Sequence, residues 1–274
     1  MPENVVGMKR NNDYGDGFHT VPAFIKEAFH LEQKIDKRMQ DILEIYENNS
    51  LGLDDTFQFK CRGCGKCCKN REDILLTARD LYNIAGHLGR TVEYIVDRYC
   101  EVYVGDASRL PIVRLKPSGP EKVCPLLRDR RCIVHKAKPV VCALFPLGRG
   151  TSMTKTDGGI ETSDRFQPRY FVQPASCGTP DHTQTVRSWL EQFGIPAEDE
   201  FHKLWTEAIT IISEFLRSME AREITEKTME LCWNAAIFGL YMNYDPKNEL
   251  IPQFRENAVK LLAVFNDISA MAEK

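Results

Sequence analysis

Apolar residues recur at helical spacing near both ends of the chain and only sporadically in its middle. The last third shows this pattern in four segments, at about residues 186–193, 198–220, 226–243 and 252–271. Residues 21–47 show it as well, with mostly three- and four-residue steps between Phe24, Phe29, Leu31, Ile35, Met39, Ile42 and Ile45. The pattern predicts one amphipathic helix after a polar N-terminal stretch, and a small C-terminal helical bundle.

The middle of the chain, from about residue 57 to residue 178, is interrupted by Gly and Pro and predicts only short elements. Thr77 and Asp80 have the spacing of a capping box, which predicts a helix running to about His87. Thr91 is placed to cap a second helix. Strand-like runs follow at Ile112–Leu115, Ile133–Val134 and Tyr170–Val172. These pieces are too short to build a large sheet core, so a metal cross-link would be needed to stabilise the region.

Composition and charge exclude several classes of protein. The chain has 274 residues, 43% of them hydrophobic and 27% charged, which excludes wholesale disorder. Lys and Arg number 36 against 39 Asp and Glu, so no basic excess predicts a nucleic-acid partner. No apolar run approaches the roughly 20 residues that span a bilayer, which predicts no membrane partner. The polar, charged first residues show no export signal, and we therefore expect a cytoplasmic protein.

Ten cysteines change this ordinary picture, because nine of them fall between residues 61 and 177. A reducing cytosol disfavours disulfides, so such a cluster favours metal binding or catalysis over a covalent framework. The densest motif is Cys61-Arg-Gly-Cys64-Gly-Lys-Cys67-Cys68. Its two glycines can adopt positive φ and turn backbone N–H groups toward sulfur. Its neighbouring cations, Arg62, Lys66 and Lys69, are expected to lower thiol pKa values.

Further cysteines follow in conspicuous contexts: Cys124-Pro125-Leu126, Cys132-Ile-Val-His135, Lys138-Pro139-Val-Val-Cys142-Ala-Leu-Phe145-Pro146, and Cys177. Together with the first motif, they resemble the YkgJ-type cysteine-cluster proteins, also described as putative zinc- or iron-chelating domain proteins. The resemblance covers about Phe59 to Gly178. It implies metal binding through eight cysteines: Cys61, Cys64, Cys67, Cys68, Cys124, Cys132, Cys142 and Cys177. Flagellin lysine methylases share this cysteine pattern, which hints at an iron–sulfur centre in them.

The identity of the metal is open between two chemistries. Thiolate ligands suit a 4Fe–4S cluster, which takes four cysteines, and they equally suit a pair of four-cysteine zinc sites. The later cysteines are spaced by 8, 10 and 35 residues and lack a second C-x2-C step. We favour iron–sulfur, because a cluster tolerates scattered ligands on loops better than a zinc ribbon does. Cys67 and Cys68 diverge if the chain is extended there, so one of them would serve a second metal or remain free.

Other candidate residues have plainer explanations. Cys100 and Cys232 lie in helical apolar patterns and are predicted to pack in the core. His135 is predicted to support the ligands rather than join them, since eight cysteines suffice. The aromatic residues of the last third are predicted to form the core of the bundle: Trp189, Phe193, Trp205 and Trp233.

The sequence thus predicts a mainly α protein in three parts. Residues 1–56 form the N-terminal tail and helix, 57–182 a loop-rich, metal-stapled cysteine-cluster domain with a few short strands, and 183–274 a helical bundle. The expected function is an iron–sulfur protein with a redox or protein-modification role, whose partner is a protein substrate or redox partner. The alternatives are a zinc-stapled interaction module without catalysis, and metal storage or delivery. Common phosphate-loop, dinucleotide-binding and hydrolase motifs are missing from the sequence. The run Gly148-Arg149-Gly150 is too short to indicate a phosphate loop. Whether the protein is an enzyme therefore stays open.

Overall fold

The computed structural model of the protein describes residues 48–150, 168–222 and 224–272. The helix predicted for residues 21–47, and the polar stretch before it, lie outside this part of the chain. The described residues are mainly α-helical, as predicted. Their α-helices are α2 (Ala78–Leu88), α3 (Val92–Tyr99), α4 (Val140–Leu144), α5 (Val186–Glu191), α6 (Glu200–Ala221), α7 (Glu226–Ile237) and α8 (Leu250–Ala272).

The strands form antiparallel pairs rather than one sheet. These are β1 (Thr56–Lys60) with β8 (Thr179–Thr185), β2 (Cys100–Val104) with β3 (Pro111–Leu115), β4 (Leu127–Arg128) with β5 (Arg131–Cys132), and β6 (Leu147–Gly150) with β7 (Arg169–Val172). The strands predicted at residues 112–115 and 170–172 are confirmed. The strand predicted at Ile133–Val134 is wrong by two residues, because Val134 already leads into a 3-10 helix at His135–Ala137.

The predicted helix caps of the middle segment are confirmed. The Asp80 carboxylate accepts a hydrogen bond from the Thr77 N–H at 2.8 Å, and the Thr77 side chain accepts one from the Asp80 N–H. Both halves of the capping box are therefore present at the start of α2. The Thr91 side chain caps α3 by accepting from the Tyr94 N–H. Gly89 ends α2 in the left-handed conformation that glycine adopts without strain.

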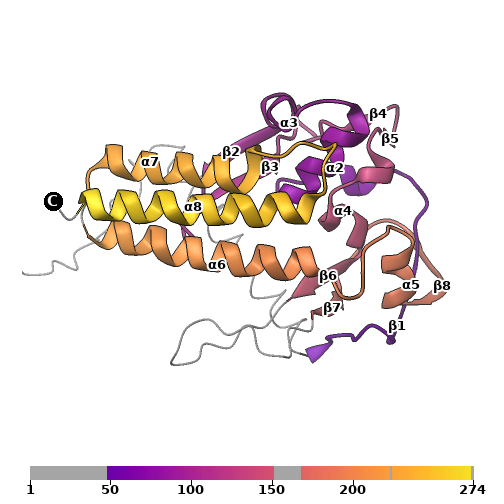
Figure 1. Ribbon diagram of the computed structural model, residues 1–274. Helices are drawn as coiled ribbons and strands as arrows, with labels where there is room; N and C mark the ends of the chain where they lie inside the picture. Colours follow the sequence, from indigo (N-terminus) through magenta and orange to yellow (C-terminus); the bar gives the residue numbers. More distant parts are fainter. Residues whose placement is uncertain (1–47, 151–167, 223, 273–274) are drawn as a thin grey trace, which may run out of the picture.

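Three long helices, α6, α7 and α8, pack side by side into a bundle (Figure 1). Their apolar faces meet in one core, where each fully buried large side chain contributes roughly 1.5–3 kcal/mol. α7 continues into a π-helical segment at Phe238–Met242, so the helix predicted for residues 226–243 changes its hydrogen-bonding pattern near its end. The side chains at the centre of this core include Phe201, Trp205, Leu216, Met219, Phe254, Leu261 and Phe265.

The expected fourth helix of the bundle lies elsewhere. α5 has six residues and follows β8 directly, so the pairing of β8 with β1 holds it beside that strand. Its Trp189 ring packs edge-on against Phe57 and Phe59, in a second, smaller core. The prediction that Trp189 and Phe193 form the bundle core is therefore wrong, whereas Trp205 does lie in that core.

The larger core runs without interruption from the middle of the chain into the bundle. Buried residues of α2 and α3, such as Leu81, Ile84 and Ile95, belong to the same apolar cluster as those of α6 to α8. The Tyr241 hydroxyl donates to the Pro111 carbonyl at 3.3 Å, which adds a polar contact between the two regions. None of the helices in the described ranges combines the length and the apolar character that crossing a membrane requires.

Candidate metal centre

The loop that carries the first four cysteines has the local geometry that its glycines predict. Gly63 has φ 62° and Gly65 has φ 70°, and both lie in the left-handed region. The Gly63 N–H donates to the Cys61 sulfur at 3.4 Å. A 3-10 helix, Lys66–Cys68, begins directly after Gly65 and carries the adjacent cysteines. The loop therefore turns a backbone donor toward a thiol, as predicted.

Cys67 and Cys68 are adjacent residues of this 3-10 turn, and each thiol shifts the pKa of the other. The turn replaces the extended strand in which neighbouring side chains would diverge. The hydrogen bond from Cys68 lowers the pKa of the Cys67 thiol to about 6, and the positive charges of Lys138 and Arg71 act in the same direction. The same hydrogen bond, together with burial, raises the pKa of Cys68. The interaction therefore favours the thiolate at Cys67 over that at Cys68.

The cations beside this thiolate differ from those that the sequence predicts. Lys69 forms an ion pair with Glu121 at 2.6 Å. Lys138 lies 3.9 Å from the centre of the Phe193 ring, and Arg71 is half-buried beside Phe145. Sequence spacing could not reveal Lys138, because it reaches Cys67 from a segment about seventy residues away along the chain.

Three further cysteines converge on this pair from separate segments. The Cys124 N–H donates to the Cys68 carbonyl at 2.8 Å, which joins their two loops directly. Cys132 lies in β5, and Cys142 lies in the short helix α4. The charges of these thiols act on one another, and burial is the main cause that raises the pKa of each of the three.

Cys177 lies against the other end of the motif. Its thiol is in hydrogen-bonding contact with that of Cys64 and is close enough to Cys61 and Cys67 to be affected by their charges. Burial is the largest cause that raises the pKa of Cys177 to about 11. The effects of these thiols on one another's pKa values divide the eight predicted ligands into two groups, and Cys67 interacts with members of both. The first group is Cys61, Cys64 and Cys177, and the second is Cys68, Cys124, Cys132 and Cys142.

All ten cysteines are free thiols, so the structure contains no disulfide between them. Across the described ranges, no three or more His, Cys, Asp or Glu side chains already stand in a metal-binding arrangement, and metal stapling is not shown. The donor set nonetheless suits a thiophilic metal, since eight cysteines are free of disulfides and Lys138 and Arg71 act on one of them, Cys67. A cavity of about 450 Å³ opens beside Cys67 and Cys177 and is also lined by Lys66, Lys69, Arg71 and Phe145, among others.

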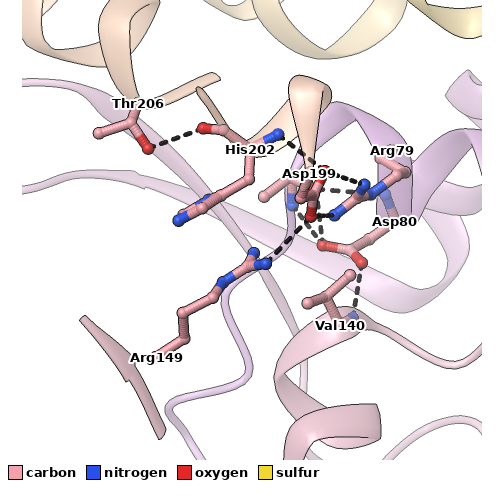
Figure 2. Close-up of polar contacts among 8 residues, drawn as sticks. Arg79, Asp80, Val140, Arg149, Asp199, His202 and Thr206 are labelled. Atoms are coloured by element: carbon pink, nitrogen blue, oxygen red, sulfur yellow. Dashed lines mark hydrogen bonds and ion pairs between the residues drawn. The ribbon is translucent and has the colours of Figure 1, made fainter. Parts of the chain in front are cut away.

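Asp80 fixes the helix that carries Cys142. One of its carboxylate oxygens accepts from the Val140 N–H at 2.7 Å, which holds the first turn of α4 (Figure 2). The other accepts from the N–H and the hydroxyl of Thr77, each at 2.8 Å. Burial raises the pKa of Asp80, and these hydrogen bonds oppose that effect. The side chain therefore joins α2 to the metal-binding region.

The neighbouring residue, Arg79, joins the same region to the bundle. Its guanidinium donates two hydrogen bonds to Asp199, at 2.6 and 2.7 Å, and Arg149 of β6 donates a third at 3.0 Å (Figure 2). Asp199 also caps α6 by accepting from the His202 N–H. Burial opposes ionisation of Asp199, but the hydrogen bonds and charges of the two arginines lower its pKa to about 2. The Gly148-Arg149-Gly150 run thus supplies an ion pair rather than a phosphate loop.

The remaining candidate residues lie outside the two groups of thiols. Cys100 and Cys232 are buried in the larger core, as predicted, and burial raises the pKa of Cys100 to about 12. His135 is exposed in its 3-10 helix, and burial of its ring and the charge of Lys138 lower its pKa. Its supporting role beside the ligands stays a prediction.

Comparison with known proteins identifies the cysteine-rich segment. Residues 60–166 match the family model described as "CxxCxxCC: Putative zinc- or iron-chelating domain". The match covers less than half of the chain, and we refer to the matched residues as the CxxCxxCC domain. The CxxCxxCC domain contains seven of the eight predicted ligands, and Cys177 lies beyond its matched end. The predicted metal binding is thereby supported, whereas the choice of metal and the link to flagellin lysine methylases stay predictions.

One curated relative is an uncharacterized protein of Methanocaldococcus jannaschii, 28% identical over 88 residues. The aligned part covers 32% of this chain and 44% of the relative, which is less than half of either protein. No solved structure matches the chain. The C-terminal helices α6 to α8 lie outside the CxxCxxCC domain, so the family description says nothing of their role.

Proposed function

We propose that this chain is an iron–sulfur protein whose CxxCxxCC domain holds its cluster through cysteine thiolates. The observation that carries the proposal is that Cys67 interacts with five other free thiols, most of them from distant segments: Cys68, Cys124, Cys132, Cys142 and Cys177. Structural cysteines in a core are inert and scattered, whereas ligands gather where cations stabilise the thiolate. The charges of Lys138 and Arg71 act on Cys67 in this way.

The two groups of thiols suggest how the ligands divide. With Cys67 added to Cys61, Cys64 and Cys177, each group has four cysteines, which is the number that a 4Fe–4S cluster takes. The first group would then hold the cluster, and Cys68, Cys124, Cys132 and Cys142 would hold a second metal. This division also explains how two neighbouring cysteines can both be ligands, because Cys67 and Cys68 would bind different metal centres.

A bound cluster would supply one-electron transfer, which suits a redox or protein-modification role. The surrounding chain would hold the ligands in place, exclude bulk water from the more buried group, and offset negative charge with Lys138 and Arg71. The cavity beside Cys67 and Cys177 would leave one side of the centre open to a substrate or redox partner. An enzymatic step is not assigned, because no substrate-activating group is defined beside the thiols.

The proposal is tested by measuring iron, zinc, acid-labile sulfide and visible absorption on protein purified without oxygen. We expect iron and sulfide in equal amounts, with a broad charge-transfer absorption band. Stoichiometric zinc without sulfide would overturn the iron–sulfur proposal and favour the zinc-stapled interaction module. Weak metal binding with rapid transfer to an acceptor would instead favour metal storage or delivery.

Cysteine variants separate ligands from structural thiols in the same assay. Cys64→Ser and Cys142→Ser each remove one proposed ligand and are expected to lower the bound metal. Cys100→Ser and Cys232→Ser alter buried cysteines of the larger core and should leave the metal content per folded protein unchanged. Loss of metal in Cys100→Ser would show that the ligand assignment is wrong.

A further inference from the structure

Positive charge is concentrated around the cysteines, although the whole chain is slightly acidic. Residues 60–71 and 128–138 contain ten of the 36 Lys and Arg residues but one of the 39 Asp and Glu residues, Asp129. The rest of the chain is correspondingly acidic. The net charge of the whole chain therefore does not reflect the local excess of positive charge around the cysteines. Such a local excess affects how a protein associates with charged partners.

Six exposed side chains form what we call the basic surface: Arg62, Lys66, Arg128, Arg130, Arg131 and Lys136. Within the part of the chain that the structure describes, none of the six forms an ion pair with a carboxylate. Arg62 is close enough to Asp181 to lower the pKa of that carboxyl group, but the contact is longer than an ion pair. Arg128 donates one hydrogen bond to the Leu127 carbonyl at 3.0 Å, and most of the charge of the basic surface faces solvent.

The hairpin β4–β5 concentrates this charge in an unfavourable way. Arg128 and Arg131 are directly opposite each other in the strand pair, and like charges in that position destabilise a hairpin. Between them, Asp129 has φ 47° and Arg130 has φ 60°, a left-handed conformation that is uncommon for residues other than glycine. A two-residue hairpin loop needs positive φ at both central residues, so the fold itself explains this conformation. The repulsion between Arg128 and Arg131 has no such explanation within the hairpin.

The hairpin and the cysteine loop lie against each other. A Cβ atom added to Gly65 would stand 3.6 Å from the Arg130 carbonyl oxygen and 3.8 Å from the Leu127 Cδ1 atom. Arg62 and Lys66 belong to this same loop, and Cys132 follows Arg131 in β5. Figure 1 shows β4 and β5 at the upper right of the molecule, whereas the long helices extend to the left. The basic surface therefore borders the metal-binding region and not the bundle.

We infer that the basic surface docks an acidic face of a partner protein and brings that partner to the cysteine cluster. The purpose of the docking rests on the proposed function, but the binding itself does not require a particular metal. Charge complementarity of this kind gives fast, salt-sensitive encounters, as electron carriers use. A nucleic acid is disfavoured, because the two basic segments contain no Phe, Tyr or Trp on which bases could stack.

The test uses fluorescently labelled poly-L-glutamate as the acidic probe and an RNA duplex of equal charge as the competing one. Fluorescence anisotropy measures their binding to the full chain at about 0.02 M and about 0.2 M salt, concentrations that span weak and strong screening. We expect the chain to bind poly-L-glutamate more tightly than RNA, and to lose most of that affinity at the higher salt concentration.

Charge reversal locates the binding. The triple variant Arg128→Glu, Arg130→Glu and Arg131→Glu should weaken poly-L-glutamate binding at least about tenfold at low salt, since it removes charge contacts that steer association. The matched control reverses three exposed cations of the last third, Arg217, Lys227 and Lys247, and changes the net charge equally. The control should bind within about twofold of the wild type. Equal losses in the two triple variants would overturn the inference.

A single substitution tests the same surface in case the triple variant fails to fold. Arg131→Glu converts the repulsive pair with Arg128 into an attractive one, so the hairpin should keep or gain stability while binding weakens. Tighter binding of RNA than of poly-L-glutamate, lost in the same variant, would assign a nucleic-acid partner and overturn the inference. Metal analysis of each sample keeps the two proposals separate, because probe binding without iron or sulfide would refute the cluster and leave the docking surface standing.

Discussion

Asp199 offers a sharp test of how the cysteine-cluster domain is attached to the bundle. Its side chain is 3% exposed and accepts hydrogen bonds from Arg79, Arg149 and the His202 N–H. Asp199→Asn keeps the shape of the side chain but removes its charge. Two guanidinium groups, 16% and 9% exposed, would then lack their counter-charge, and an amide NH2 would face arginine donors.

The size of the effect follows from the pKa of this carboxyl group. A fall from 3.8 to about 2 is equivalent to about 2.5 kcal/mol of stability at neutral pH, at about 1.36 kcal/mol for each tenfold change in the ionisation constant. Removing one partner of a buried ion pair typically costs about 3–5 kcal/mol, because the other charge stays buried and unpaired. We therefore expect Asp199→Asn to lower the free energy of unfolding by roughly 3 kcal/mol.

Urea unfolding of wild type and variant, with the same metal loading, measures this difference. The matched control is Asp54→Asn, which breaks the exposed pair with Arg187 and should change stability far less. Because the folded pKa of Asp199 is lowered, its contribution is fully present above pH 3.8 and is lost as the pH falls through about 2. The penalty should therefore be constant from pH 7 to pH 5 and shrink below pH 4. Equal losses in the two variants, or a penalty that grows on acidification, would refute the reasoning.

Three other substitutions probe the supports of the site. Asp80→Ala should lower the free energy of unfolding by about 1–3 kcal/mol in urea, because it leaves the half-buried N–H that begins α4 without this acceptor. Gly178→Ala should destabilise much more than Gly119→Ala in thermal unfolding, since both have positive φ but only Gly178 would bring a Cβ within 2.2 Å of the Phe59 ring. Cys177→Ser should lower the bound metal without abolishing it in elemental analysis, because the second group of thiols keeps its four members; complete loss would contradict the division into two groups.

Local patterns in the sequence predicted the elements that local physics determines. Thr77 and Asp80 form the expected capping box, because both halves of that motif lie within one helical turn. Gly63 and Gly65 adopt the expected left-handed conformation, because the turn between neighbouring cysteines requires it. The faces of α6 and α8 follow the helical spacing of their apolar residues.

Contacts between distant segments could not be predicted in this way. Trp189 and Trp205 lie in similar apolar patterns, yet they belong to different cores, because the pairing of β1 with β8 diverts α5 from the bundle. Arg79 and Asp199 are 120 residues apart in sequence, and no spacing rule relates them. The approach of Lys138 to Cys67 likewise depends on the tertiary fold.

The same distant contacts link the thiols to the bundle and lead to a last prediction. Cys142 lies in α4, whose first turn is held by Asp80; the next residue, Arg79, holds Asp199, which caps α6. Binding free energy at a thiolate site also stabilises the fold that presents the ligands. If these contacts transmit the binding free energy of the metal to the bundle, chelation of the metal should lower the unfolding temperature of the bundle. Tryptophan fluorescence measures that temperature, because the buried Trp205 of α6 contributes to it. Asp199→Asn removes the ion pairs that link the two regions, so chelation should lower the unfolding temperature of this variant by less than it lowers that of the wild type. An equal shift in both proteins would show that the metal stabilises the bundle through the shared apolar core instead, without passing through Asp199.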